Sequence, residues 1–139
     1  MNIVVDTNIF ISALIKNSLT RDLIVNSQQN LILPEFEFIE IENHKEEILR
    51  KSYLSENEFK ILLNKLLKYV KIIKTEETIN YKQEAFDIIG EIDEDDTIFF
   101  ATALAYNAVI WSDDKHFQKQ DKIKILTTQD MIKLLEDIE

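Results

Sequence analysis

The segment that decides the fold reads "DEDDTIFFATALAYNAVIWSDDKHF" and spans residues 93–117. After its acidic start, apolar residues recur at helical spacing and then give way to a β-branched run. The apolar stretch is shorter than the ~20 residues that a membrane span needs. It therefore predicts a buried helix that begins at Asp95 or Asp96, followed by a buried strand over 108–111. This strand runs directly into Ser112, Asp113 and Asp114.

The same alternation extends through the rest of the chain. Short apolar runs predict further strands at 3–5, 31–33, 70–73 and 123–126. Between them the spacing predicts helices over 9–14, from Thr20, from Pro34 to about Lys51, after the capping box of Ser55 and Glu58, over 85–89 with Gly90 at the end, and from Thr127 or Thr128 to 138. This order predicts a single α/β domain over residues 1–139, with a central parallel sheet of about 4–5 strands and helices on both faces. A ligand site is expected beyond the carboxyl ends of the strands.

Composition excludes several classes of protein. The net charge of −10 argues against a nonspecific nucleic-acid binder, although not against an enzyme whose site holds cations. With one glycine in the chain there is no phosphate-binding loop and no dinucleotide fingerprint. The absence of cysteine excludes disulfides and thiolate metal sites, and together with the lack of a signal peptide or membrane span it predicts a cytoplasmic protein.

Four acids stand where an α/β domain places its site. Asp6 and Asp114 follow short buried strands, Asp96 opens a helix, and Glu40 lies about two turns inside the helix after Pro34. Each has an ordinary alternative: a helix cap for Asp6 and Asp96, a solvated helix face for Glu40, and a turn for Asp114. Their neighbours also compete for the same role: Glu37 and Glu42 with Glu40, Asp95 with Asp96, and Asp113 with Asp114.

Clustered carboxylates limit the chemistry. Such groups repel one another and have raised pKa values unless a cation neutralises them. An all-oxygen set suits Mg²⁺ or Mn²⁺, and these ions favour phosphodiester hydrolysis as the reaction class. His44 and His116 lack the spacing of a zinc site and are expected at the surface.

With these residues in place, the chain resembles the PIN domain nucleases over essentially its whole length. The opening "NIVVDTNIFISALI" resembles the first strand and helix of that family, with the first acid at Asp6. "PEFEFIEIENHKEEI" resembles the segment that supplies the second acid, at Glu40. In residues 93–117, Asp96 and Asp114 match the third and fourth acids, and Asp93 matches an auxiliary acid.

The resemblance implies an endoribonuclease that uses one or two Mg²⁺ or Mn²⁺ ions to cleave single-stranded RNA. Asp6, Asp96 and Glu40 would hold a metal, and Asp114 and Asp93 would help with a second metal or with water. The hydrogen-bonding groups beside these acids would be Thr7, Asn8 and Ser112. Many members are VapC-type toxins that pair with an antitoxin and form homodimers, so both partners are expected here.

The phosphate contacts and two alternatives to a nuclease complete the prediction, with the nuclease as the first interpretation. The predicted RNA phosphate contacts are the cations nearest the motifs, Lys16, Arg21, Lys45 and Lys115, although each could simply be solvated. A PIN-like module that binds RNA or a partner without cutting is a second reading of the chain. A phosphatase or receiver-like domain that uses Asp6 as its nucleophile is a third; it is disfavoured because Asn8 stands where that pattern requires an acid.

Overall fold

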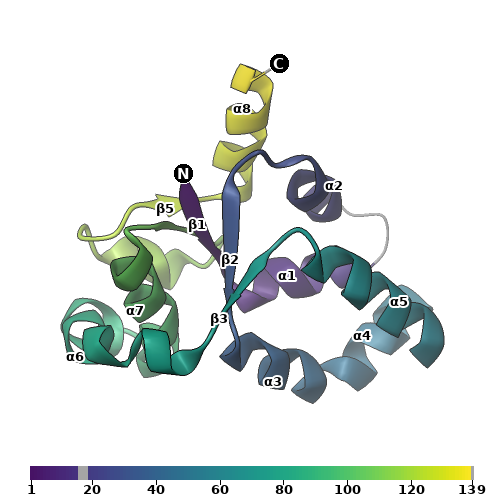
Figure 1. The fold of residues 1–139 in the computed structure, drawn as a ribbon, viewed down its shortest axis with the longest axis horizontal. Helices are drawn as coiled ribbons and strands as arrows, with labels where there is room; N and C mark the ends of the chain where they lie inside the picture. The colour runs from purple at the N-terminus through teal and green to yellow at the C-terminus, as the bar shows by residue number, and fades with distance from the viewer. Residues whose placement is uncertain (16–18, 139) are drawn as a thin grey trace.

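The computed structural model describes residues 1–15 and 19–138 (Figure 1). The strands are β1 (Asn2–Val5), β2 (Asn30–Pro34), β3 (Lys71–Ile73), β4 (Val109–Trp111) and β5 (Ile125–Leu126). The α-helices are α1 (Thr7–Leu14), α2 (Leu19–Asn26), α3 (Phe36–Asn43), α4 (Lys45–Ser52), α5 (Glu56–Leu67), α6 (Lys82–Ala85), α7 (Thr97–Tyr106) and α8 (Thr128–Ile138). Short helical turns complete the chain at η1 (Thr75–Glu77), η2 (Ile79–Tyr81), η3 (Phe86–Gly90), η4 (Glu94–Asp96) and η5 (Lys115–Lys119).

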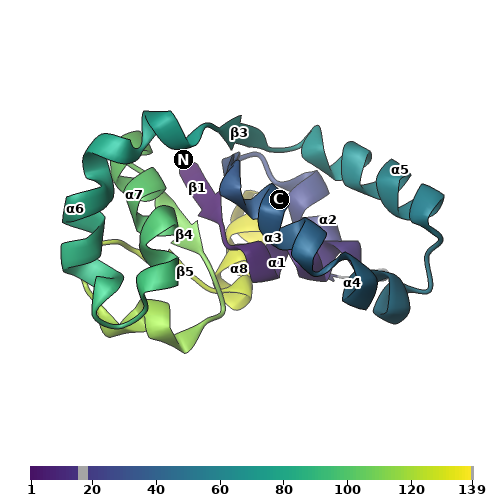
Figure 2. The same cartoon turned by 90° about the horizontal axis from the view of Figure 1, so that it is seen from below.

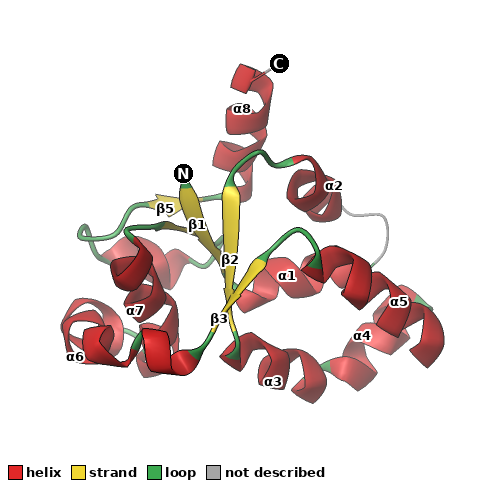
Figure 3. Ribbon diagram, viewed as in Figure 1, coloured by secondary structure: helices red, strands yellow, loops and turns green. Residues whose placement is uncertain are grey.

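The five strands form one sheet in the order β3-β2-β1-β4-β5, and all neighbouring pairs are parallel. Helices cover both faces of this sheet, as Figure 3 shows in red around the yellow strands. The predicted α/β class and parallel sheet are therefore confirmed. The chain builds outward from β1 to β2 and β3, then returns to place β4 on the other side of β1. The carboxyl ends of β1 and β4 thus lie side by side at the point where strand order reverses, which is where ligands bind in open α/β sheets.

Alternating side chains of the strands separate two hydrophobic cores. In β1, Ile3 and Val5 pack into the core under α1, α2, α5 and α8, whereas Val4 packs into the core under α7. In β4, Trp111 belongs to the first core and Ile110 to the second. A strand buried on both faces needs an unbroken apolar run, and the inner strands β1, β2 and β4 show this pattern, whereas the edge strand β3 begins with the exposed Lys71 and Ile72.

Helix α7 is largely buried between the sheet and α6. Its apolar residues surround it rather than forming one stripe, and six of its ten residues are buried. Within the two described ranges, no helix is long and apolar enough to cross a membrane. The apolar character of α7 is explained by the packing of α6 and the sheet on opposite sides of it.

Three details differ from the sequence prediction. The helix predicted from Pro34 to about Lys51 is two helices, because the chain turns at His44 (φ −100°, ψ 6°). Pro34 is the last residue of β2 and does not begin a helix. Gly90 was predicted to cap a helix, but its φ is not positive; it is the last residue of η3. A Cβ at Gly90 would collide with the ring of Phe86, so this position requires glycine for space rather than for backbone freedom.

Candidate active site

Asp6 lies at the carboxyl end of β1 and is only 5 % exposed. It occupies the N-cap position of α1, yet its side chain makes no cap hydrogen bond. Its carboxylate instead faces β4: Ser112 Oγ donates a hydrogen bond of 2.7 Å to Asp6 Oδ2. The sheet register explains this contact, because Val5 pairs with Trp111 and the next residue of each strand therefore meets across the same edge.

Ser112 links Asp6 to Asp114. The Ser112 side chain is completely buried, and its hydroxyl oxygen also accepts a hydrogen bond of 3.1 Å from the backbone N–H of Asp114. The Asp114 carboxylate in turn accepts a bond from the N–H of His116 at 2.9 Å. This short chain of hydrogen bonds fixes the direction of the Asp6 carboxylate and the course of the loop that carries Asp114.

The neighbouring Asp113 has a different role. Its two carboxylate oxygens accept hydrogen bonds from the backbone N–H and the hydroxyl of Thr128, at 2.7 and 2.6 Å. Asp113 therefore anchors the first residue of α8, next to the cap formed by Thr127 and Asp130, on the far side of the loop. Of the two adjacent acids, Asp114 is the one turned toward Asp6.

Asp96 sits at the start of α7 and is half-buried. Its Oδ2 is buried and has no hydrogen-bond partner. Burial, followed by the nearby charges of Asp93, Asp6 and Asp114, raises the pKa of Asp96 from 3.8 to about 8. This coupling places Asp96 with Asp93, Asp6 and Asp114 in one electrostatic group, whereas the adjacent Asp95 is exposed.

Burial also raises the pKa of Asp6, and the charge of Asp114 adds to this effect. The hydrogen bond from Ser112 and the backbone N–H groups of Asn8 and Thr7 lower that pKa in part. Asn8 was predicted to assist through its side chain, but that side chain is exposed and its backbone makes the contribution. The Thr7 hydroxyl is buried beside Glu37 rather than turned to solvent.

The second motif places Glu37 close to Asp6, and Glu40 close to Glu37. Glu40 is about one-third exposed, and its carboxylate lies 3.9 Å from a ring nitrogen of His44. Glu37, one turn earlier in α3, is completely buried. Burial, the charge of Asp6 and the charge of Glu40 raise the pKa of Glu37 well above its ordinary value, and Thr7 lowers it in part.

The sequence pattern could have indicated the position of Glu37 but not that of His116. Glu37 stands four residues before Ile41, the buried residue of the same helix face, and this spacing would have identified it as inward-facing. His116 was predicted at the surface and is half exposed, but its Nδ1 lies 3.6 Å from Asp93 and 3.9 Å from Asp114. Nothing in the spacing of the sequence indicates that contact.

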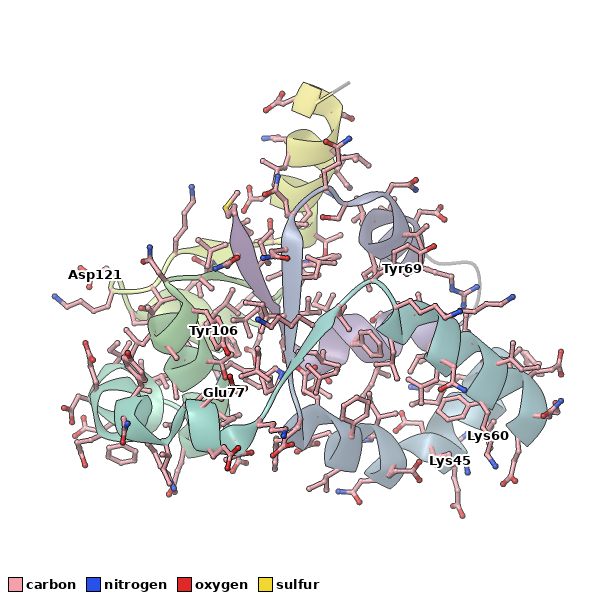
Figure 4. All side chains as sticks on the ribbon, viewed as in Figure 1. Lys45, Lys60, Tyr69, Glu77, Tyr106 and Asp121 are labelled. Carbon is pink, nitrogen blue, oxygen red and sulfur yellow. The ribbon has the colours of Figure 1, made fainter. Side chains whose placement is uncertain are left out.

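The predicted phosphate contacts are distributed unevenly. Lys115 is exposed next to Asp114, and Lys45 pairs with Glu56 at 3.9 Å. Figure 4 labels Lys45 on α4 and Lys60 on α5, the two helices that together form an arm. Arg21 instead donates from Nε to the carbonyl of Ala13, near the end of α1 opposite to Asp6. Lys16 lies outside the described residues.

The acids fit a cation by their chemistry. Every donor is a carboxylate oxygen, the pKa values of the most buried members are raised, and one buried oxygen of Asp96 has no partner. In the described part of the chain, no three acidic or histidine side chains already form a cluster that could hold a metal ion. The acids are thus an electrostatically coupled set at one rim, and the fit to a cation rests on the donor type and on the unpartnered oxygen.

A groove of about 810 Å³ is lined by residues next in sequence to the acids, although by none of the acids themselves. Phe36, next to Glu37, lines it from α3, and Asp95 and Thr97, on either side of Asp96, line it from the other side. Figure 2, which views the molecule from below, shows α3 facing the layer of α6 and α7 across this edge of the sheet. Farther along the groove, the ring of Phe86 is 39 % exposed.

Comparisons with known proteins agree with this geometry. A family model described as a PIN domain matches residues 4–136. Among solved structures, the chain is similar to a chain of VapBC2 from Rickettsia felis bound to a DNA fragment from their promoter, with a TM-score of 0.66 and 16 % identity over 91 % of this chain and 98 % of that chain. No curated protein sequence matches the chain.

Proposed function

The chain belongs to the PIN domain family, and from this membership we propose that it is a metal-dependent endoribonuclease that hydrolyses phosphodiester bonds of single-stranded RNA. One observation carries the proposal: at the sheet edge where strand order reverses, the charges of Asp93, Asp6 and Asp114 raise the pKa of Asp96, and the charge of Asp114 also raises that of Asp6. Four acids kept this close are costly without a cation. If these acids served only to stabilise the fold, the burial of Asp96 Oδ2 without a hydrogen-bond partner would have no explanation.

In this proposal Asp6, Asp96 and Glu40 hold one Mg²⁺ or Mn²⁺, and Asp114 and Asp93 bind a second ion or orient water. When bound, the metal supplies positive charge at the phosphate oxygens and lowers the pKa of water. The chain's own residues keep the carboxylates in place. Ser112 fixes the orientation of Asp6 through its 2.7 Å hydrogen bond, and such supporting contacts affect metal affinity strongly.

Substrate binding must overcome the net charge of −10. Lys115 and Lys45 are the proposed phosphate contacts, since the first is exposed beside Asp114 and the second lies on the arm next to α3. Arg21 is withdrawn from this role because it binds a backbone carbonyl at the far end of α1. The presence of Phe36 and Phe86 in the groove favours a single strand as substrate, because stacking on an aromatic side chain requires an unpaired base.

The proposed partners follow from the VapC-type members of the family. We propose that the protein is cytoplasmic, forms a homodimer, and is the toxin of a pair whose antitoxin blocks the acidic rim. A small neighbouring gene that encodes a DNA-binding protein, and co-purification of its product with this chain, would support the pairing.

The experiment is incubation of the protein with tRNA and mRNA in Mn²⁺, in Mg²⁺ and in chelator, with Asp6→Asn beside the wild type. We expect cleavage with a divalent ion, no cleavage in chelator, and a loss of at least 100-fold in Asp6→Asn. Full Mn²⁺-dependent cleavage by Asp6→Asn would refute the assignment of the site.

A further inference from the structure

Glu37 is the most deeply enclosed acid of the chain's described part. Its side chain is 0 % exposed, in the first turn of α3, where Ile41 packs into the core one turn later. Its nearest charges are those of Asp6 and Glu40, so its carboxylate faces the acidic rim rather than solvent. The family resemblance assigns the second acid to Glu40 and leaves Glu37 as a competing neighbour for that one position, not as an additional ligand.

Neither oxygen of Glu37 has a hydrogen bond of regular geometry. The Thr7 hydroxyl is also buried beside Glu37 and lies near enough to lower the pKa of Glu37, but the contact falls outside the limits of a hydrogen bond. Buried polar groups in native proteins are satisfied in the great majority of cases, and an ionised carboxylate left without a partner is among the most costly. The N-terminus of α3 favours a negative charge, but no backbone N–H donates to Glu37.

Simple burial does not explain the choice of residue. A leucine or methionine at position 37 would fill the same space beside Ile41 and carry no unpartnered oxygen. A carboxylate here is useful when a positive group meets it, and no Lys, Arg or His contributes to its electrostatics, which come from Asp6, Thr7 and Glu40. A cation from outside the chain would supply the positive group that the chain itself does not place there.

We propose that Glu37 is a ligand of the divalent cation at this rim, which it reaches from the α3 side together with Asp6. This inference rests on the proposed function in that it takes the rim to bind a cation. It adds an inward-facing oxygen donor that the four-acid pattern of the family lacks. The cation site of this chain would then extend farther toward the buried side of α3 than the four acids of the family pattern imply.

Mn²⁺ binding by the full chain tests the proposal without reference to cleavage. Calorimetric or paramagnetic-resonance titration compares the wild type with Glu37→Gln, which keeps the shape and removes the charge. The matched control is Glu42→Gln, which removes the same charge from the same helix at an exposed position. We expect Glu37→Gln to weaken Mn²⁺ binding at least tenfold and to reduce the rise in unfolding temperature that Mn²⁺ produces, and Glu42→Gln to stay within twofold of wild type.

Wild-type affinity in Glu37→Gln would overturn the proposal and leave the nuclease assignment intact. If Glu37→Gln does not unfold cooperatively, Glu37→Asp replaces it, with an expected severalfold loss of Mn²⁺ affinity; unchanged affinity in Glu37→Asp would also overturn the proposal. A wild type that binds Mn²⁺ through Glu37 but cleaves no RNA would instead refute only the proposed function.

Discussion

Replacing Asp96 with asparagine should change how stability depends on pH in the absence of divalent ions. The folded protein raises the pKa of this carboxyl from 3.8 to about 8, so the stability that the protonated group contributes is complete below pH 3.8 and is lost as pH rises through about 8. For an isolated group, the free energy of unfolding would fall by about 1.4 kcal/mol per pH unit, or about 4 kcal/mol between about pH 5 and 8. Asp96 is half-buried and water screens its neighbours, so about 2 kcal/mol is expected, or ~6 °C in a domain of this size.

Thermal unfolding of chelator-treated protein across this pH range provides the assay. The wild type should lose stability as pH rises, and Asp96→Asn should lose about 2 kcal/mol less, because the amide does not titrate. Asp95→Asn, at an exposed neighbouring position, should follow the wild type. Adding Mn²⁺ should restore the wild type at high pH but not Asp96→Asn. Parallel pH curves for the wild type and Asp96→Asn would refute the electrostatic account of the rim.

Three further substitutions separate the site from its support. Ser112→Ala should destabilise the protein by about 1–3 kcal/mol, because a buried hydrogen bond is lost. It should also weaken Mn²⁺ binding, measured by calorimetry, by about 10–100-fold, because the Asp6 carboxylate loses its fixed orientation. Asp113→Ala should cost ~1 kcal/mol in chemical denaturation through loss of the hydrogen bonds to Thr128 at the start of α8 but leave RNA cleavage unchanged; a loss of cleavage would place Asp113 in the site. Gly90→Ala should cost about 1–3 kcal/mol because its Cβ meets the Phe86 ring, and a neutral result would show that the ring moves aside freely.

The sheet was predictable because its inner strands are buried on both faces. Runs such as 3–5 and 108–111 contain only apolar residues and are too short for a helix, and this combination is typical of a buried parallel strand. The same runs fixed the positions of Asp6 and Ser112 at one edge. The turn at His44 was not predictable, because the apolar spacing of α3 and α4 continues across it and only the backbone angles record the break.

The choice between adjacent acids depended on contacts distant in sequence. Helical spacing alone favoured Asp96 over Asp95, and the structure places Asp96 inward. For Asp113 and Asp114 the sequence offered no such guide, since the partner of Asp113 is Thr128 in the next helix. Arg21 was expected near the rim because it is close to the first motif in sequence, but α2 packs at the other end of α1.

A contact away from the candidate site was likewise not predictable from the sequence. Tyr106 at the end of α7 donates a hydrogen bond of 2.8 Å to Glu77, and Lys71 of β3 lies 5.4 Å from the centre of the Tyr106 ring. Figure 4 shows Tyr106 and Glu77 next to each other although they are far apart in the chain. This contact joins α7 to the edge strand, and neither residue stands in a motif that would have indicated it.

The central claim is that the coupled acids at the carboxyl edge of the sheet form the site of RNA cleavage. Its most direct measurement is the single-turnover rate of cleavage of an end-labelled single-stranded RNA in saturating Mn²⁺, for the wild type, Asp96→Asn and Asp95→Asn. We expect the wild type and Asp95→Asn to cleave at similar rates and Asp96→Asn to be at least 100-fold slower. Equal rates for all three proteins would contradict the account.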